Sequence, residues 1–404
     1  MSRKWIEEEG QRWVEMGIIT GEQKEKIAAL YPYKKSAGER LPVFAAILVG
    51  AGILTFIASN WGIIPPLLRL CIIFVALGGF YVAGYRAEQS GSRSLGTALL
   101  SLGVVAFGAG IFLTGQMFHL VAYDARAFII WSLPAVALAL LYRSHLLSFL
   151  GILILNAGQL YSAISFQQFS WLLLLILAVG VGSYALQSRE RTIVMVWTPS
   201  VLLHALLYLI AAEHAIGWLL LVSAVLYAAL DFLPDRRMRI AGQLGTLTSA
   251  FFLAVFFIFF LGEMQHEPVP PVALFLPLFV GAAGLSLLGK RRYGERISLY
   301  EWVIFLPFFY WPEIGDVLYL LALFALSGGL LWSGYREEWS GKVTAGTLLF
   351  LLSTFIGYIQ VAWAFLPKSL FFLVGGLLLF ALNAFLQRQR RKLLAGEGKG
   401  GGQP

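Results

Sequence analysis

A polar cluster is predicted at one end of the first apolar segments of the chain. Arg69 lies just inside an apolar segment, and burial of its charge requires a partner such as Asp124. Asn60 and Gln116 offer neutral amides, and His119 lies three residues beyond Gln116. If the helices that carry them pack together, these residues form a ligand-binding pocket for an anionic group. The alternative is that Arg69 reaches back to the water interface and the amides cap helix ends.

A second group of polar residues lies near the centre of apolar segments. Asn156 and Gln159 are three residues apart, so they share one face of a helix, and His204 is near the middle of a later segment. Buried amides can hold helices together or line a polar path across a bilayer. Both interpretations stay open for these candidate intramembrane polar residues.

Two carboxylates, Asp231 and Glu301, lie about one helical turn inside the predicted ends of their apolar segments. Arg236, Arg237 and Arg296 are close to them in the sequence. Local charge neutralisation by these arginines is the simpler interpretation, and a proton-coupled carboxylate is the alternative.

Histidines and glutamates recur in the predicted loops on one side of the apolar segments. Imidazole and carboxylate groups could bind zinc or another divalent cation. No pair has the helical spacing of a recognised metal motif, so we interpret them as loop residues and expect no metal, no cofactor and no catalytic residue. The residues concerned are His119, His214, His266, Glu213, Glu263 and Glu267.

The composition indicates the elements that must position these residues. The chain has 404 residues, of which 59% are hydrophobic and 13% charged, whereas soluble domains are about a quarter charged. So much apolar surface requires lipid as its solvent. We predict an all-α polytopic membrane bundle of about fourteen transmembrane helices between residues 41 and 386. The predicted spans are 41–60, 67–85, 95–115, 127–142, 146–163, 170–187, 193–212, 215–233, 240–261, 271–288, 297–311, 315–334, 343–364 and 369–386.

Basic residues predict the orientation of these spans. With the N-terminus in the cytoplasm, 27 of the 30 lysines and arginines fall in inner segments, as the positive-inside rule requires. This placement explains the net charge of +8 without nucleic acid, which we do not expect as a partner. Both termini are predicted to be cytoplasmic, and the oligomeric state is not predicted.

The two ends of the chain differ from the apolar region. Residues 1–40 are predicted to form a cytoplasmic amphipathic helical hairpin, whose second helix begins at a capping box from Thr20 to Gln23. The hairpin is too small for a core of its own and is a candidate site for a cytoplasmic protein partner. Residues 387–404 are predicted to form a basic, glycine-rich cytoplasmic tail.

An internal similarity links the two ends of the membrane region. Residues 84–102 and 334–352 share 10 identities in 19 positions at a constant offset of 250. The similarity includes a polar loop, so shared hydrophobicity does not explain it. We interpret it as a duplication of spans 1–4 as spans 11–14, with similar hairpin chemistry as the alternative; transporters often contain such repeats.

Four stretches of the sequence resemble one bacterial family. They are residues 56–61 (Phe-Ile-Ala-Ser-Asn-Trp), 65–66 (Pro-Pro), 84–86 (Gly-Tyr-Arg) and 108–120. The family is known as domain of unknown function 2157 and is described as predicted membrane proteins. The resemblance covers mainly residues 5–145. It implies a bacterial inner-membrane protein and brings no established activity.

Three classes of function follow from these features. The helix number, the repeat and the polar cluster favour a transporter or flippase-like carrier of a small or lipid-linked solute. A non-catalytic envelope assembly or scaffold protein that binds its partner through residues 1–40 is the first alternative. The second is an intramembrane lipid-modifying enzyme, for which Arg69, His119 and Asp124 would form the site.

Overall fold

The structure is a computed structural model. It describes residues 3–29, 64–295, 299–337 and 340–362, with a few further residues between 45 and 59 and between 370 and 381, among them the run 373–377. All regular secondary structure in this part of the chain is helical. The chain divides into two compact units, one formed by residues 1–122 and 133–150 and the other by residues 123–132 and 151–404.

Two short helices, α1 (Arg3–Glu15) and α2 (Gly21–Ala29), begin the chain. Gly17 lies between them with a φ of +71°, a conformation that favours glycine. At the start of α2, the Thr20 amide donates to Gln23 Oε1 at 2.9 Å and the Gln23 amide donates to Thr20 Oγ1 at 3.3 Å. These are the reciprocal bonds of a capping box. Lys24 Nζ donates to Gln11 Oε1 at 2.6 Å and so joins the two helices.

A tightly packed helical hairpin follows, formed by α4 (Pro66–Gln89) and α5 (Arg93–Met117). Proline at the first position of α4 suits a helix start, where its missing amide hydrogen is not needed. A Cβ on Gly84 would lie 3.0 Å from the Leu100 amide nitrogen, and one on Gly96 would lie 2.9 Å from the Glu88 amide nitrogen. The two glycines therefore let the helix backbones approach each other closely.

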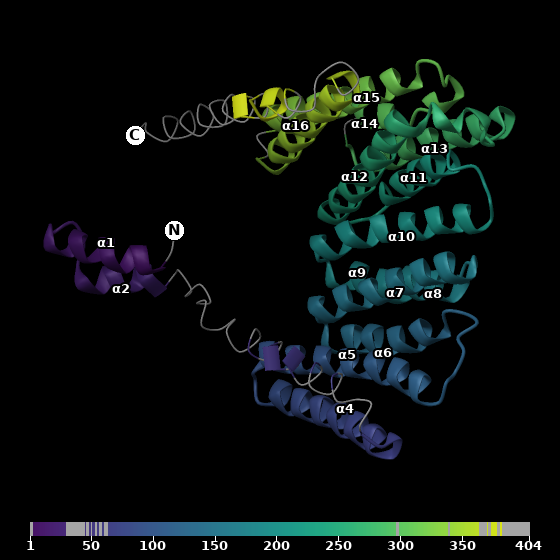
Figure 1. Cartoon of the computed structure of the whole chain (residues 1–404). Helices are drawn as coiled ribbons and strands as arrows, with labels where there is room; N and C mark the ends of the chain where they lie inside the picture. The colour runs from purple at the N-terminus through teal and green to yellow at the C-terminus, as the bar shows by residue number, and fades with distance from the viewer. Residues whose placement is uncertain are drawn as a thin grey trace. The chain divides into compact units, whose positions relative to one another are not determined.

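The second unit contains most of the remaining helices, which run side by side in Figure 1 from α10 to α13. Residues of α6 (Arg126–Tyr142) and α7 (His145–Phe166) are divided between the two units. The other elements, in chain order, are α8 (Trp171–Leu175), the π-helix η1 (Ile176–Val181), α9 (Gly182–Ser188), α10 (Arg191–Ala211), α11 (Trp218–Leu230), α12 (Arg236–Phe260), η2 (Glu263–His266), α13 (Val272–Arg292), α14 (Leu299–Trp302), η3 (Val303–Phe305), η4 (Phe308–Tyr310), α15 (Gly315–Arg336) and α16 (Ser340–Ala362).

The core of the second unit is aromatic. Helix α12 packs against α10 and α15, and α11 packs against α13. Phe251, Phe257, Phe275, Phe305 and Tyr319 are all fully buried there, and the rings of Phe257 and Tyr319 stack with centroids 5.0 Å apart. This core fixes the relative positions of α11, α12, α13 and α15.

A second helical hairpin, α15 with α16, repeats the local packing of α4 with α5. A Cβ on Gly334 would lie 2.8 Å from the Val343 amide nitrogen, and one on Gly346 would lie 2.8 Å from the Leu331 amide nitrogen. Gly334 and Gly346 correspond to Gly84 and Gly96 at the offset of 250. The two hairpins therefore close through glycines at equivalent positions.

Nine helices in the described residues are long and apolar enough to cross a membrane. They correspond to nine of the fourteen predicted spans, with α8, η1 and α9 forming one of them. The predicted spans 127–142 and 215–233 correspond to the shorter apolar helices α6, with 17 residues, and α11, with 13. Most residues of the predicted spans 41–60 and 369–386 lie outside the described residues.

The predicted single helix at 297–311 is wrong. Three short elements, α14, η3 and η4, occupy this stretch instead. Pro307 lacks an amide hydrogen and disfavours helix at the residue before it, and Leu306 accordingly has extended dihedral angles. The described residues thus contain nine long apolar helices and two shorter ones, at the positions of eleven predicted spans.

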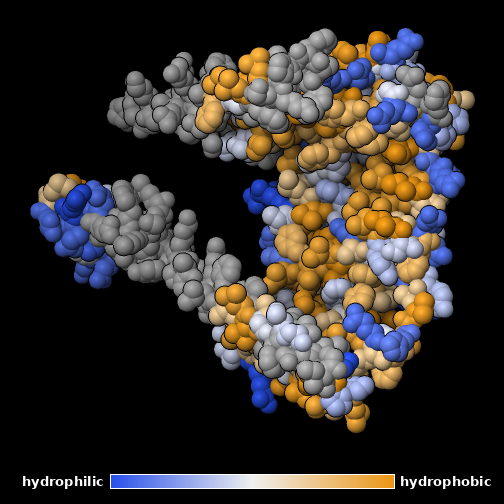
Figure 2. Space-filling model, viewed as in Figure 1, coloured by the Kyte–Doolittle hydropathy of each residue, from blue (hydrophilic) through white to orange (hydrophobic). Residues whose placement is uncertain are grey.

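Apolar side chains cover much of the helix sides seen in Figure 2, and hydrophilic ones gather near helix ends. On α4, for example, Leu67, Phe74 and Val75 are each at least two-thirds exposed. Apolar surface of this extent on long helices is suited to contact with lipid tails rather than water.

Candidate functional site

A buried ionic cluster joins α11, α13 and α14. Lys290 Nζ lies 3.1 Å from Glu301 Oε2 and donates to the Tyr227 hydroxyl at 3.0 Å. The Tyr227 hydroxyl in turn donates to Glu301 Oε2. Tyr227 is fully buried, and Lys290 and Glu301 are 4% and 8% exposed. Burial of either charge alone would cost several kcal/mol, so each stabilises the other in this position.

Asp231 forms a second polar contact one helical turn from the first. Tyr227 and Asp231 are four residues apart at the end of α11, and Ser286 and Lys290 are four residues apart on α13, so each pair shares a helix face. The Ser286 hydroxyl donates to Asp231 Oδ2. Gln243 Nε2, from α12, donates to Asp231 Oδ1 at 2.6 Å. The buried Asp231 carboxyl is thus held by two neutral donors.

A third contact lies at the start of α12. The Arg239 guanidinium is 3% exposed; one nitrogen donates to Glu295 Oε1 at 2.6 Å and another to the Leu233 carbonyl at 2.5 Å. The Cζ atom of Arg239 lies over the Tyr293 ring, 4.2 Å from its centroid. Arg236, which is largely exposed, approaches the same Glu295 oxygen at 3.7 Å. Asp235 caps α12 by accepting from the Arg237 amide at 2.8 Å.

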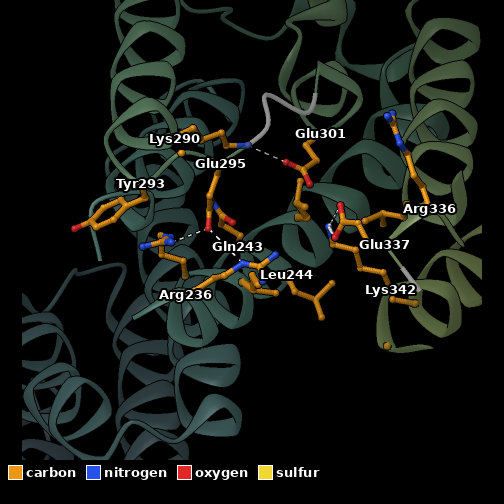
Figure 3. Close-up of a pocket in the computed structure, with 17 residues that line it drawn as sticks. Arg236, Gln243, Leu244, Lys290, Tyr293, Glu295, Glu301, Arg336, Glu337 and Lys342 are labelled. Carbon is orange, nitrogen blue, oxygen red and sulfur yellow. Dashed lines mark hydrogen bonds and ion pairs between the residues drawn. The ribbon is translucent and has the colours of Figure 1, made fainter. Parts of the chain in front are cut away.

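These contacts border a pocket of about 590 Å³ between α12, α13, α15 and α16. Figure 3 shows Arg236, Lys290 and Glu295 on one side and Arg336, Glu337 and Lys342 on the other. Five basic side chains and three carboxylates line the pocket, so it carries an excess of positive charge when all are ionised. Its volume lies within the usual range for small-molecule sites.

The broken segment after residue 298 forms one wall of the cluster. The Tyr227 ring packs against Trp302 and Phe305, with centroids 5.7 Å and 5.6 Å apart. Tyr300 donates to Ser333 on α15 at 2.8 Å. In membrane proteins, interrupted helices are tolerated where they are buried in protein or line a cavity, and Glu301 lies on such a segment at the pocket.

Asp231 and Glu301 are the two predicted site residues that the structure places in this cluster. Their hydrogen-bond and ion-pair partners come from other helices, not from the neighbouring arginines that the sequence favoured. Arg236 and Arg239 contact Glu295 instead, and Arg296 lies outside the described residues.

The predicted mid-span residues lie elsewhere in the second unit. Asn156 Nδ2 donates to Ser200 Oγ at 3.0 Å, which joins α7 to α10. The Gln159 side chain is fully buried. In the amide orientation that satisfies both of its groups, its nitrogen donates to the Ser170 carbonyl at 3.1 Å and its oxygen accepts from the Ser170 amide at 3.2 Å. His204 is fully buried one turn after Ser200, near the Leu155 backbone, and neither ring nitrogen makes a hydrogen bond of ordinary geometry in the described structure.

The polar cluster predicted at one end of the first apolar segments lies only partly within the described residues. Asn60 lies outside the described residues. Arg69 Nε donates to the Ile64 carbonyl at 2.5 Å, next to the start of its own helix. Gln116 and His119 are exposed at the end of α5, and His119 has a φ of +52°. Asp124 belongs to the second unit and pairs with Arg126 at 2.8 Å.

The loop histidines and glutamates form no candidate metal site in the described residues. No group of three or more histidine, cysteine, aspartate or glutamate side chains there could hold a metal ion. Glu213, His214, Glu263 and Glu267 do line a separate pocket of about 690 Å³.

Several residues of the cluster were not predicted from the sequence. Lys290 begins a run of basic residues that resembles a cytoplasmic loop, and Tyr227, Gln243 and Ser286 are individually unremarkable in apolar segments. The one available indication was the spacing of Tyr227 with Asp231 and of Ser286 with Lys290, which places each polar pair on one helix face.

The comparisons with known proteins concern the other part of the chain. Residues 11–148 match the family model described as "Predicted membrane protein (DUF2157)". The resemblance predicted from the sequence is thereby confirmed, and the chain is a membrane protein of unknown function with several apolar helices. The DUF2157 match covers α4, α5 and α6 and ends well before the buried cluster. No curated protein and no solved structure matches the chain.

Proposed function

We propose that this protein is a carrier of a small or lipid-linked solute across the bacterial inner membrane. The observation that carries this proposal is the buried cluster of Asp231, Lys290 and Glu301 beside a pocket between apolar helices. Ionisable groups within membrane segments are costly, and they typically mark a solute or ion pathway. A purely structural membrane bundle has no need of a charged pair at 4% and 8% exposure.

The proposal includes the orientation predicted from the basic residues. In that orientation both termini are cytoplasmic, and the pocket lies toward the cytoplasmic ends of α12, α13, α15 and α16. It also includes about fourteen membrane crossings, with the stretch 299–311 as an interrupted one. The matching glycines of the α4–α5 and α15–α16 hairpins support the proposed duplication.

In this carrier, the pocket is a solute chamber and the ionic cluster is its inner wall. The interrupted stretch 299–311 bears Glu301 and could shift without unwinding a long helix, because it is already divided at Pro307. Such a shift would alter the contact of Glu301 with Lys290 and so couple the wall of the pocket to its occupancy.

The test is reconstitution of the full chain into liposomes. Scrambling of head-group-labelled phospholipid would be measured together with uptake of labelled phosphate, glycerol 3-phosphate, glucose and choline. We expect at least one of these to cross faster than in protein-free liposomes. The double substitution Lys290→Met with Glu301→Met should reduce that rate about tenfold or more, because both buried charges are removed without leaving one unpaired. Arg291→Gln, at the exposed neighbouring position outside the pocket, is the matched control.

Other outcomes would assign the chain to the alternative classes. If none of the five probes crosses, and deletion of residues 1–29 releases a specific bound protein, the assembly role replaces the carrier. If a lipid head group is instead turned over in a reaction that requires His119, the protein is a lipid-modifying enzyme.

A further inference from the structure

The charges around the pocket are not fully paired within the described residues. Lys290 pairs with Glu301, Arg239 with Glu295, and Lys342 with Glu337. Arg236 has only the longer contact of 3.7 Å to Glu295, which Arg239 already occupies. The Cζ atom of Arg336 lies 5.5 Å from the centroid of the Trp332 ring, and Arg336 makes no ion pair with a described carboxylate. Two exposed arginines, on opposite sides of the pocket, thus have no carboxylate of their own among the described residues and add positive charge to it.

One buried donor at the pocket lacks an acceptor. Arg239 lines the pocket and is 3% exposed, yet its Nε makes no hydrogen bond in the described part of the chain. A buried donor without a partner costs about 1–3 kcal/mol. An anion in the pocket would supply the missing acceptor, and the planar guanidinium suits the paired oxygens of a phosphate.

Two long helices begin at this pocket. Arg236 and Arg239 lie in the first turn of α12, which has 25 residues, and Gly341 and Lys342 lie in the first turn of α16, which has 23. The first-turn amides of a helix have no backbone partner within the helix, and its dipole is positive at this end. On α12 the Arg237 amide is already bonded to Asp235, so the other first-turn amides are the ones that remain for an anion. Phosphate groups commonly bind at such positions.

From these three observations, we propose that the pocket binds a phosphate group, with Arg236 and Arg239 as its ligands and Arg336 as a further positive charge on the opposite wall. Its volume of about 590 Å³ leaves room for an organic group attached to the phosphate. A lipid head group and a soluble phosphate ester share this chemistry. This inference rests on the proposed function in one respect: the carrier proposal identifies the pocket as the chamber that holds the solute.

Binding would be measured with the purified full chain in phosphatidylcholine nanodiscs. Inorganic phosphate and glycerol 3-phosphate are titrated by calorimetry, and phosphatidic acid retention is compared with phosphatidylcholine by native mass spectrometry. Binding of the soluble probes alone assigns a soluble ester. Retention of phosphatidic acid, or its competition with glycerol 3-phosphate, assigns a lipid head group.

The variants use exposed arginines, so that folding is preserved. Arg236→Gln combined with Arg336→Gln should weaken phosphate binding about tenfold or more, because the first removes a charged hydrogen bond and both remove positive charge from the pocket. Arg237→Gln is the matched control, since Arg237 is exposed on the same turn and does not line the pocket; its affinity should stay within about threefold.

Two results would overturn the inference: no binding of any phosphate probe, or an equal loss in Arg237→Gln. Transport of a labelled solute without phosphate binding would leave the carrier intact and remove the phosphate site. Phosphate binding without any transport would leave the site intact and remove the carrier.

Discussion

Gly289 on α13 lies directly against Asp231 at the end of α11, and a Cβ at position 289 would come within 2.7 Å of the Asp231 Cβ. This close approach brings Ser286 and Lys290, on either side of Gly289 in the sequence, to the polar groups of α11. The absence of a side chain at one position thus permits the contacts of two others.

Gly289→Ala should therefore destabilise the protein. The added methyl group would meet the Asp231 Cβ, which is fixed to the backbone of α11 and cannot move away easily. Overpacking of this kind costs about 1–3 kcal/mol. Thermal unfolding in detergent would measure the loss. Gly284→Ala on the same helix has open space around its Cβ, so it should be neutral or stabilising by up to about 1 kcal/mol. An equal effect of the two substitutions would contradict the close approach of α11 and α13.

The buried pair of Lys290 and Glu301 should show strong coupling in a double-mutant cycle. Lys290→Met or Glu301→Met alone leaves one buried charge unpaired, at a cost of about 3–5 kcal/mol, whereas the double substitution should cost clearly less than the sum. Unfolding temperatures of the four proteins test this expectation. The more exposed pair of Glu337 and Lys342 serves for comparison, with a coupling of about 1 kcal/mol or less. Additive losses at the buried pair would mean that the two charges do not interact.

The equivalent glycines of the two hairpins should respond alike to substitution. Gly84→Ala and Gly334→Ala each place a methyl group against the backbone of the partner helix, so each should lose about 1–3 kcal/mol in stability. Gly78→Ala and Gly328→Ala, which also correspond at the offset of 250, have no neighbour within 4 Å and should lose nothing. Unfolding in detergent distinguishes the two sets. Opposite behaviour at positions 84 and 334 would argue against a common origin of the hairpins.

Substitution of the buried His204, in contrast, should not destabilise the protein. Because neither ring nitrogen has a hydrogen bond of ordinary geometry, His204→Leu should leave the unfolding temperature unchanged or raise it. Ser200→Ala, one turn away, removes the bond to Asn156 and should cost about 1 kcal/mol. A marked loss in His204→Leu would reveal that the imidazole has a bound partner, such as an ordered water molecule.

Two polar residues of the candidate site could be predicted from the sequence, but the residues that they contact could not. Asp231 and Glu301 stand out because a carboxylate is rare in an apolar segment, and this signal is local. Their contacts with Ser286, Gln243 and Lys290 depend on the packing of α11, α12 and α13, which residue spacing alone does not reveal.

For the helical segments as well, local signals were predicted from the sequence and features that depend on tertiary contacts were not. Nine predicted spans correspond to long helices, because a continuous apolar run of sufficient length is a strong local signal. The stretch 297–311 has a similar composition, yet it is divided at Pro307 and held by contacts of Tyr227 and Tyr300 with neighbouring groups. Tertiary contacts there compensate for the lost helical hydrogen bonds, and hydropathy does not report them.

The order of the buried cluster along the chain has a consequence for biosynthesis. Tyr227 is made 63 residues before Lys290, and Lys290 is made 11 residues before Glu301. The short helix α11, with 13 residues, thus leaves the ribosome long before its polar end can meet a partner, and Lys290 precedes its counter-ion. Entry of these helices into the bilayer one at a time would expose both groups to lipid. We therefore expect α11 to α14 to be retained at the insertion machinery and released together.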